Sequence, residues 1–216
     1  MYQRDYLMRM IEQVTDVLGQ VMGLRRRKEH HEAQRVIDDL FDRRFRLNGR
    51  LVQSLSAKDL AAMLTVNGTT DTASLEAVAR LVKEHGDIED ELGNEGARYA
   101  RYCKALDLYL HLAVAARETR LGDAREAVRE LLALLSPYEL PPETKRLLAG
   151  WHEHEGRYAE AENWLHEYLE DAEEGRDEAE AFYRRLLLLD DARLEAGGLT
   201  REEAETGLAE LNRQGV

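Results

Sequence analysis

Apolar residues recur every three or four positions along most of this chain, and that spacing is typical of one face of an α-helix. The stripes cover residues 2–24, 28–47, 57–66, 72–86, 97–121, 124–135, 143–155, 159–172, 177–196 and 200–212. No segment alternates apolar and polar residues well enough to predict a strand. The pattern therefore predicts an all-α protein of about ten or eleven helices.

Small polar residues and glycines mark the expected helix ends. Ser56 followed by Asp59 indicates a helix start, and Thr200 followed by Glu203 has the spacing of a capping box. Gly86 is expected to end the helix that precedes it, because glycine is the usual residue just after a helix.

A loop at residues 93–96, with two glycines and one asparagine, is the best candidate for a domain boundary. We therefore expect an N-terminal helical region at residues 1–93 and helical hairpins at residues 94–216. With so few loop residues between them, the alternative is one continuous domain.

A short phrase occurs twice in the second half: GDAREA begins at Gly122 and GRYAEA begins at Gly156, 34 residues later. A glycine turn followed by Glu-Ala and an apolar run resembles the tetratricopeptide repeat. The resemblance implies antiparallel helical hairpins stacked as a right-handed superhelix, preceded by an N-terminal hairpin. The sequence departs from that family at His111 and Lys145, where the family favours tryptophan.

The same resemblance implies a concave groove lined by the first helix of each hairpin. A groove of this kind would bind a protein or peptide partner, unless the N-terminal helices fill it. The positions that match the groove are Tyr109, Leu112, Thr119, Arg120, Arg146, Glu153 and His154.

The first stripe, residues 2–24, has two interpretations. It can close against residues 28–47 as a hairpin, or it can form a dimer seam, since about two heptads suffice as part of a larger interface. The seam residues would be Leu7, Ile11, Val14 and Leu18. The basic run at residues 25–28 is best explained as a solvated turn, with contact to an anionic membrane surface as the alternative.

The net charge of −13 is unevenly distributed. Residues 1–50 hold 11 Lys or Arg against 8 Asp or Glu, so all of the negative excess lies in the remainder. An acidic body repels phosphate backbones, which argues against nucleic acid as a partner. The single cysteine, Cys103, excludes an intrachain disulfide and suits a reducing compartment. With no apolar run long enough to cross a bilayer, we expect a cytoplasmic protein that does not engage a membrane.

Candidate chemistry is weak throughout. The histidine clusters at residues 30–31 and 152–154 lack two histidines four positions apart, which a zinc site on a helix requires. Glu162 and His166 are four apart, but a surface contact explains them better than a shared ion. Cys103 is expected to be a buried residue that packs in the core and has no catalytic role. We expect no metal, no cofactor and no enzymatic activity.

An all-α metal-dependent hydrolase is the enzyme alternative. Its basis is a series of carboxylates three residues apart, Glu167, Glu170 and Glu173, which resembles the Mg²⁺ ligands of all-α pyrophosphohydrolases. A chain with 43 acidic residues produces such spacings readily, so a solvated acidic face is the expected explanation.

The two chain ends resemble an uncharacterised family of helical proteins from Gram-positive bacteria. The residues that carry this resemblance lie at 2–12 and at 201–208. The resemblance implies a fold and a type of organism but no activity. Together these observations predict a protein-interaction or scaffold module, with a structural homodimer lacking a groove as a further alternative.

Overall fold

The computed structural model describes residues 2–66, 69–115, 119–172 and 175–213. These residues form twelve α-helices, one π-helical turn and one pair of two-residue strands, so the all-α prediction is confirmed. The chain divides into two compact units, Met1–Glu139 and Leu140–Val216. We call these the N-terminal unit and the C-terminal unit and describe each by itself.

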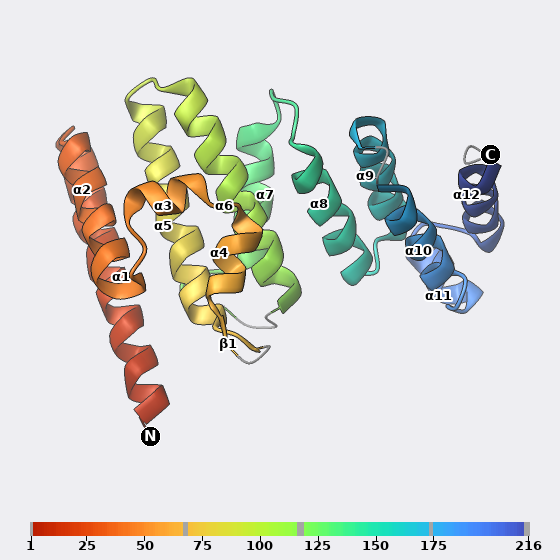
Figure 1. Ribbon diagram of the computed structural model, residues 1–216, viewed down its shortest axis with the longest axis horizontal. Coiled ribbons are helices and arrows are strands. Elements are labelled where there is room, and N and C mark those ends of the chain that lie inside the picture. Colours follow the sequence, from red (N-terminus) through yellow and green to blue (C-terminus); the bar gives the residue numbers. More distant parts are fainter. Residues whose placement is uncertain (1, 67–68, 116–118, 173–174, 214–216) are drawn as a thin grey trace. The chain divides into compact units, whose positions relative to one another are not determined.

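In the N-terminal unit, α1 packs against α2, and α5 pairs with α6, which also contacts α7 (Figure 1). Helix α5 contacts α1 and α2 as well as α6, and is the central helix of this unit. The elements are α1 (Tyr2–Arg26), α2 (His30–Leu40), the π-helix η1 (Phe41–Phe45), α3 (Gly49–Ser54), α4 (Ala57–Met63), β1 (Thr65–Val66), β2 (Thr69–Thr70), α5 (Thr72–Glu91), α6 (Glu95–Ala115) and α7 (Ala124–Leu135).

Helix α5 begins where the sequence predicts but does not end at Gly86. Asp71 caps its start by accepting a hydrogen bond from the Ser74 backbone N–H at 3.1 Å. The helix then continues through Gly86 to Glu91. A Cβ atom at position 86 would lie 2.6 Å from Cδ1 of Tyr102, so this glycine serves the close packing of α5 against α6 and does not stop the helix.

The division between units corrects the expected boundary between residues 93 and 94. That position lies between α5 and α6, which pack against each other. The Tyr102 hydroxyl on α6 donates a hydrogen bond to Asp87 Oδ1 on α5 at 2.9 Å. Because a buried tyrosine and a helix pair join the two sides, residues 94–139 belong to the N-terminal unit.

Three predicted helices prove to be interrupted, and one short strand pair was not expected. The stripe at residues 28–47 becomes α2 followed by a π-helical turn, and the stripe at 57–66 becomes α4 followed by β1. Thr65 pairs with Thr70 in an antiparallel ladder. The stripe at 177–196 breaks because Asp190 caps a new helix, accepting a hydrogen bond from the Arg193 backbone N–H at 2.8 Å.

The C-terminal unit consists of five helices in the described residues. Helices α8 and α9 form one pair, and α10 and α12 form another. The bounds are α8 (Pro142–His154), α9 (Tyr158–Asp171), α10 (Arg176–Leu186), α11 (Asp191–Ala196) and α12 (Arg201–Arg213). Its core is built around buried aromatic residues from α9 and α10, namely Tyr158, Tyr168, Phe182 and Tyr183.

The two copies of the repeated phrase form similar hairpins with different turns. Gly156 has a φ of 72° and follows α8 in a Schellman arrangement, in which the Arg157 N–H donates to the His152 carbonyl at 2.9 Å. Gly122 precedes Asp123, which caps α7 by accepting from the Arg125 N–H at 2.8 Å. The first hairpin belongs to the N-terminal unit and the second to the C-terminal unit.

Among the described residues, no helix is both long enough and apolar enough to cross a membrane.

Candidate functional site

The seven predicted groove residues are divided between the two units, and two of them are buried. Tyr109 and Leu112 on α6 are 4% and 0% exposed. They are therefore core residues of the N-terminal unit and not available to a partner, because α6 is covered by both α5 and α7. This corrects the groove prediction for these two positions.

The other groove candidates lie at partly or fully exposed positions. Thr119 and Arg120 follow α6, where the Arg120 backbone N–H donates to the buried carboxylate of Glu76 at 2.8 Å. On α8, Glu153 pairs with Arg185 at 2.7 Å, while His154 is exposed. Arg146 pairs with Glu143 at 2.7 Å. The charged side chains of Arg146 and Glu153 are thus already paired within the C-terminal unit.

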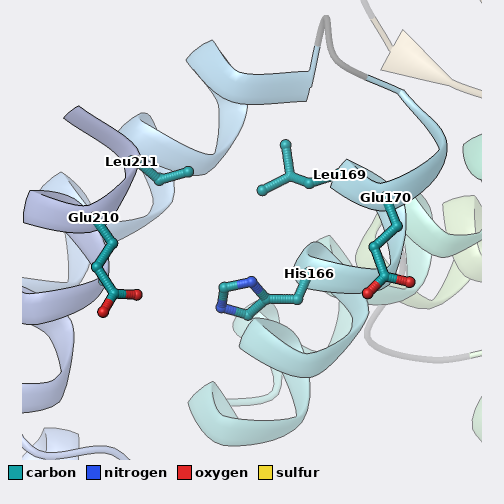
Figure 2. Close-up of a pocket in the computed structure, with 6 residues that line it drawn as sticks. His166, Leu169, Glu170, Glu210 and Leu211 are labelled. Carbon is teal, nitrogen blue, oxygen red and sulfur yellow. The ribbon is translucent and has the colours of Figure 1, made fainter. Parts of the chain in front are cut away.

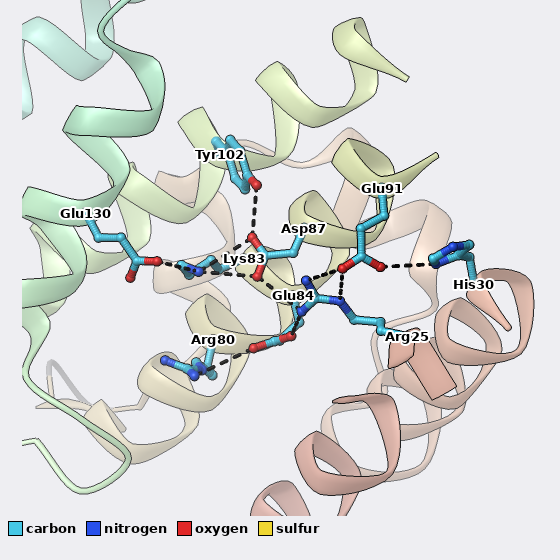
Figure 3. A network of polar contacts seen from close by, with 9 residues as sticks. All are labelled: Arg25, His30, Arg80, Lys83, Glu84, Asp87, Glu91, Tyr102 and Glu130. Carbon is cyan, nitrogen blue, oxygen red and sulfur yellow. Dashed lines mark hydrogen bonds and ion pairs between the residues drawn. The ribbon is translucent and has the colours of Figure 1, made fainter. Parts of the chain in front are cut away.

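A network of charged residues surrounds α5 in the N-terminal unit (Figure 3). Arg25 of α1 contacts three carboxylates of α5: Glu84 at 2.7 Å, Asp87 at 3.3 Å and Glu91 at 2.8 Å. Burial alone would lower the pKa of Arg25, but the hydrogen bond with Glu91 and the neighbouring carboxylates raise it overall. Arg25 is therefore fixed as a cation that fastens α1 to α5.

Further pairs extend the network to α7 and α2. Lys83, which is buried, contacts Asp87 at 3.3 Å and Glu130 of α7 at 3.0 Å. His30 of α2 contacts Glu91 at 3.2 Å. Each charged residue drawn in Figure 3 thus faces an opposite charge or a hydrogen-bond partner. A network of this kind fastens the helices of the N-terminal unit to one another.

His85 of α5 is a buried imidazole beside this network. Its Nε2 atom lies 3.8 Å from Oδ1 of Asp38, too far for a hydrogen bond. Burial lowers the pKa of His85 to about 4, and the positive charge of Arg101 acts in the same direction. The folded protein therefore holds His85 neutral at pH values where an unfolded chain would protonate it.

Acid should destabilise the protein through His85. Because its folded pKa is lowered from 6.5 to about 4, its contribution to stability is complete above pH 6.5 and is lost as the pH falls toward 4. Linkage gives a loss of about 2 kcal/mol between pH 7 and pH 5. Because burial also lowers the pKa of His152 to about 4, urea unfolding at both pH values should show a larger total loss in the wild type, and a loss smaller by about 2 kcal/mol in His85→Gln.

The matched control is His31→Gln, which changes an exposed histidine of α2. This variant should retain the full acid sensitivity. If His85→Gln loses as much stability as the wild type between the two pH values, His85 is not the group responsible.

A cleft of about 230 Å³ lies in the C-terminal unit between α9 and α12 (Figure 2). Each helix supplies residues spaced i, i+3, i+4, so that both sets share one face of their helix. The lining residues are His166, Leu169 and Glu170 from α9, and Gly207, Glu210 and Leu211 from α12.

Tyr183 of α10 fixes the side chains next to this cleft. Its hydroxyl donates to Glu162 Oε1 at 2.7 Å and lies 3.3 Å from Nε2 of His166. Burial and the hydrogen bond with Glu162 raise the pKa of Tyr183, which therefore stays protonated. A Cβ atom on Gly207 would overlap the Tyr183 ring, so only glycine at this position lets α12 approach α10 closely.

The cleft carries negative charge beside apolar surface. Glu170 and Glu210 extend from opposite helices, and both are exposed. Within the described part of the chain, neither carboxylate has an ion-pair partner. Leu169 and Leu211 lie next to them in the lining. This combination suits a ligand with an apolar stem and a cationic head.

Among the described residues, no group of three or more His, Cys, Asp or Glu side chains is placed to hold a metal ion. Of the acidic series on α9, Glu173 lies outside the described residues. Cys103 is buried as expected, and burial raises the pKa of its thiol to about 11, which leaves little nucleophilic thiolate at neutral pH.

Sequence reasoning found only part of the cleft. It singled out Glu162, His166 and Glu170, but it missed Glu210 and Tyr183. The available signal was an adjacent acid and leucine on each of two helices, three and four residues after His166 on one and after Gly207 on the other. Nothing in the sequence indicated that those two helices are neighbours.

A model of a family of unknown function, DUF6483, matches residues 1–215. No curated protein and no solved structure matches the chain.

Proposed function

We propose that this chain, a member of the DUF6483 family by a match over residues 1–215, is a protein-interaction module. It receives a basic side chain of a partner protein in the cleft between α9 and α12. The observation that carries the proposal is the pair of carboxylates, Glu170 and Glu210, on opposite sides of a cleft with apolar lining. Lysine and arginine combine an aliphatic stem with a charged head and match both features.

The wider setting of the proposal follows from the sequence. The repeated phrases at Gly122 and Gly156 favour a scaffold of tetratricopeptide-like hairpins stacked in a right-handed superhelix. The single Cys103 favours a reducing, cytoplasmic compartment, and the net charge of −13 favours basic partners over nucleic acid.

The proposal can be tested with short peptides and the full chain. The probes are Ac-Leu-Arg-Leu-NH₂, Ac-Leu-Lys-Leu-NH₂ and the neutral Ac-Leu-Gln-Leu-NH₂. Their binding is measured from changes in the amide chemical shifts of the isotope-labelled protein. We expect the basic peptides to shift resonances of α9 and α12, including His166 and Gly207. The double variant Glu170→Gln/Glu210→Gln should weaken that binding at least about tenfold, because charge-assisted hydrogen bonds are lost.

A matched control removes the same charge from the same two helices. Glu167 and Glu205 are exposed residues of α9 and α12 that do not line the cleft. The variant Glu167→Gln/Glu205→Gln should bind the basic peptides as the wild type does. Equal binding of the neutral peptide, or equal weakening by both double variants, would refute a specific cleft and indicate general attraction to an acidic surface.

A further inference from the structure

Helix α1 carries more apolar surface than its own chain covers. The residues that pack against α2 and α5 are fully or almost fully buried: Met10, Val14 and Val21 at 0% exposure and Leu24 at 4%. Val14 is therefore a core residue, which corrects its expected place in a dimer seam. The side chain of Leu7 lies outside the described residues.

A second strip runs along α1 beside the buried face. Its members are spaced by three and four residues in alternation, which is the heptad spacing of a two-helix seam. They are Met8, Ile11, Thr15, Leu18 and Met22. Met8 and Met22 are 51% and 45% exposed, whereas Ile11 and Leu18 are half-buried. We call these five residues the α1 strip.

The backbone beside the strip is open to close approach. Apart from the backbone of α1 itself and the adjoining residues, no heavy atom of the described residues would lie within 4 Å of a Cβ atom on Gly19 or Gly23. Two large apolar side chains and two glycines thus lie together on a helix surface that the described residues leave uncovered. Exposed apolar surface that follows a heptad is typical of a helix that packs on another helix.

The charges that border the strip identify the occupant. Glu12 borders it in the first half of α1 and Arg26 lies at its end, and both are exposed. In a parallel pair of identical helices, positions 12 and 26 face residues 7 and 21 of the other copy, so neither Glu12 nor Arg26 meets an opposite charge. In an antiparallel pair centred between Thr15 and Leu18, Ile11 faces Met22 of the other copy. Because helical side chains lean toward the N-terminus, the Arg26 head then meets the Glu12 carboxylate of that copy.

We propose that the α1 strip binds the α1 strip of a second copy of this chain in antiparallel orientation, with Ile11 against Met22 and Glu12 against Arg26 across the two-fold axis. The contact is independent of the cleft in the C-terminal unit. From Met8 to Met22 the helix spans about 22 Å, which is short for a coiled coil. The dimer is therefore concentration-dependent, with a dissociation constant in the micromolar range.

Sedimentation velocity over a range of about 1 to 200 μM tests this dimer, since that range brackets a micromolar constant. The wild type should pass from monomer to dimer. Glu12→Arg and Arg26→Glu should each raise the dissociation constant at least about tenfold, because each places like charges opposite one another. The swap Glu12→Arg/Arg26→Glu should restore wild-type dimerisation.

Leu18→Glu should abolish the dimer, and Met63→Glu provides the control, because Met63 is a 54% exposed methionine of α4 in the same unit. For orientation, Ile11→Cys mixed with Met22→Cys should form an oxidised cross-linked pair, whereas each variant alone should not. The proposal would be overturned if the wild type stays monomeric or if the dimer survives Leu18→Glu. It would also be overturned if the charge swap fails to restore the dimer, or if each single cysteine variant forms the cross-link alone.

Discussion

Replacement of Arg25 with methionine is expected to lower the free energy of unfolding by about 3 to 5 kcal/mol. The guanidinium contacts Glu84, Asp87 and Glu91, and the side chain of Glu84 is only 4% exposed. Methionine preserves much of the aliphatic stem but leaves the buried carboxylate of Glu84 with Arg80, at 3.6 Å, as its one remaining charged partner among the described residues. An uncompensated buried charge costs far more than a lost surface ion pair.

The measurement is chemical unfolding followed by far-ultraviolet circular dichroism, because both tryptophans, Trp151 and Trp164, lie in the C-terminal unit and do not report on α1 directly. Arg27→Met provides the matched control. Arg27 is 62% exposed and pairs with Glu29, which is itself 49% exposed, so its loss should cost about 0 to 1 kcal/mol. Similar losses in the two variants would show that the network is not buried.

The sequence predicted local structure well because local signals lie within a few residues of one another. The expected helix at residues 124–135 matches α7. The capping box at Thr200 forms as expected, with the Thr200 N–H donating to Glu203 at 2.7 Å and the Glu203 N–H donating back to the Thr200 hydroxyl. Both partners of such an interaction are visible in a short window of sequence.

The central position of α5 could not be predicted in the same way. Glu76, Lys83 and Glu84 interrupt its apolar stripe and have the appearance of a solvated face, yet all three are buried. Their partners are Arg25, which is 59 residues from Glu84, and residues of α7 and the segment before it. Pairing over such distances leaves no periodic signal, so a buried polar face and an exposed one have the same pattern.

Glycine positions were the other source of error in predicting structure from the sequence, because glycine can either end a helix or allow two helices to pack closely. At Gly156 it adopts a positive φ after a helix, as the sequence suggests. At Gly86 and Gly207 it makes room for tyrosine rings from neighbouring helices, Tyr102 and Tyr183. The second purpose depends on which helices touch. For the same reason, the chain pattern revealed His166 and Glu170 of the cleft but not the contribution of α12.

Replacement of Gly197 with alanine is expected to lower the free energy of unfolding by about 3 to 4 kcal/mol, near the upper end for overpacking. The added methyl group would overlap the ring of Tyr158 and lie 2.6 Å from the carbonyl oxygen of Gly156. The ring belongs to the buried core, and the carbonyl is backbone, so neither can move without shifting α9. The Gly197 carbonyl also accepts the hydrogen bond from the Ala159 N–H at 3.0 Å, which ties the turn before α12 to the start of α9.

The control for Gly197 is a glycine of the same unit with free space around it. Gly150 lies inside α8, and within the part of the chain that the structure describes a Cβ atom there would meet no heavy atom within 4 Å beyond the helix's own backbone and the adjoining residues. Gly150→Ala should raise the free energy of unfolding by about 0.5 to 1 kcal/mol, because alanine loses less conformational entropy in a helix. Tryptophan fluorescence during urea unfolding should follow both changes through Trp151 and Trp164. A loss of stability in Gly197→Ala and a gain in Gly150→Ala would separate the effect of packing from that of helix propensity. A gain in stability from Gly197→Ala would contradict the close approach of the turn to α9.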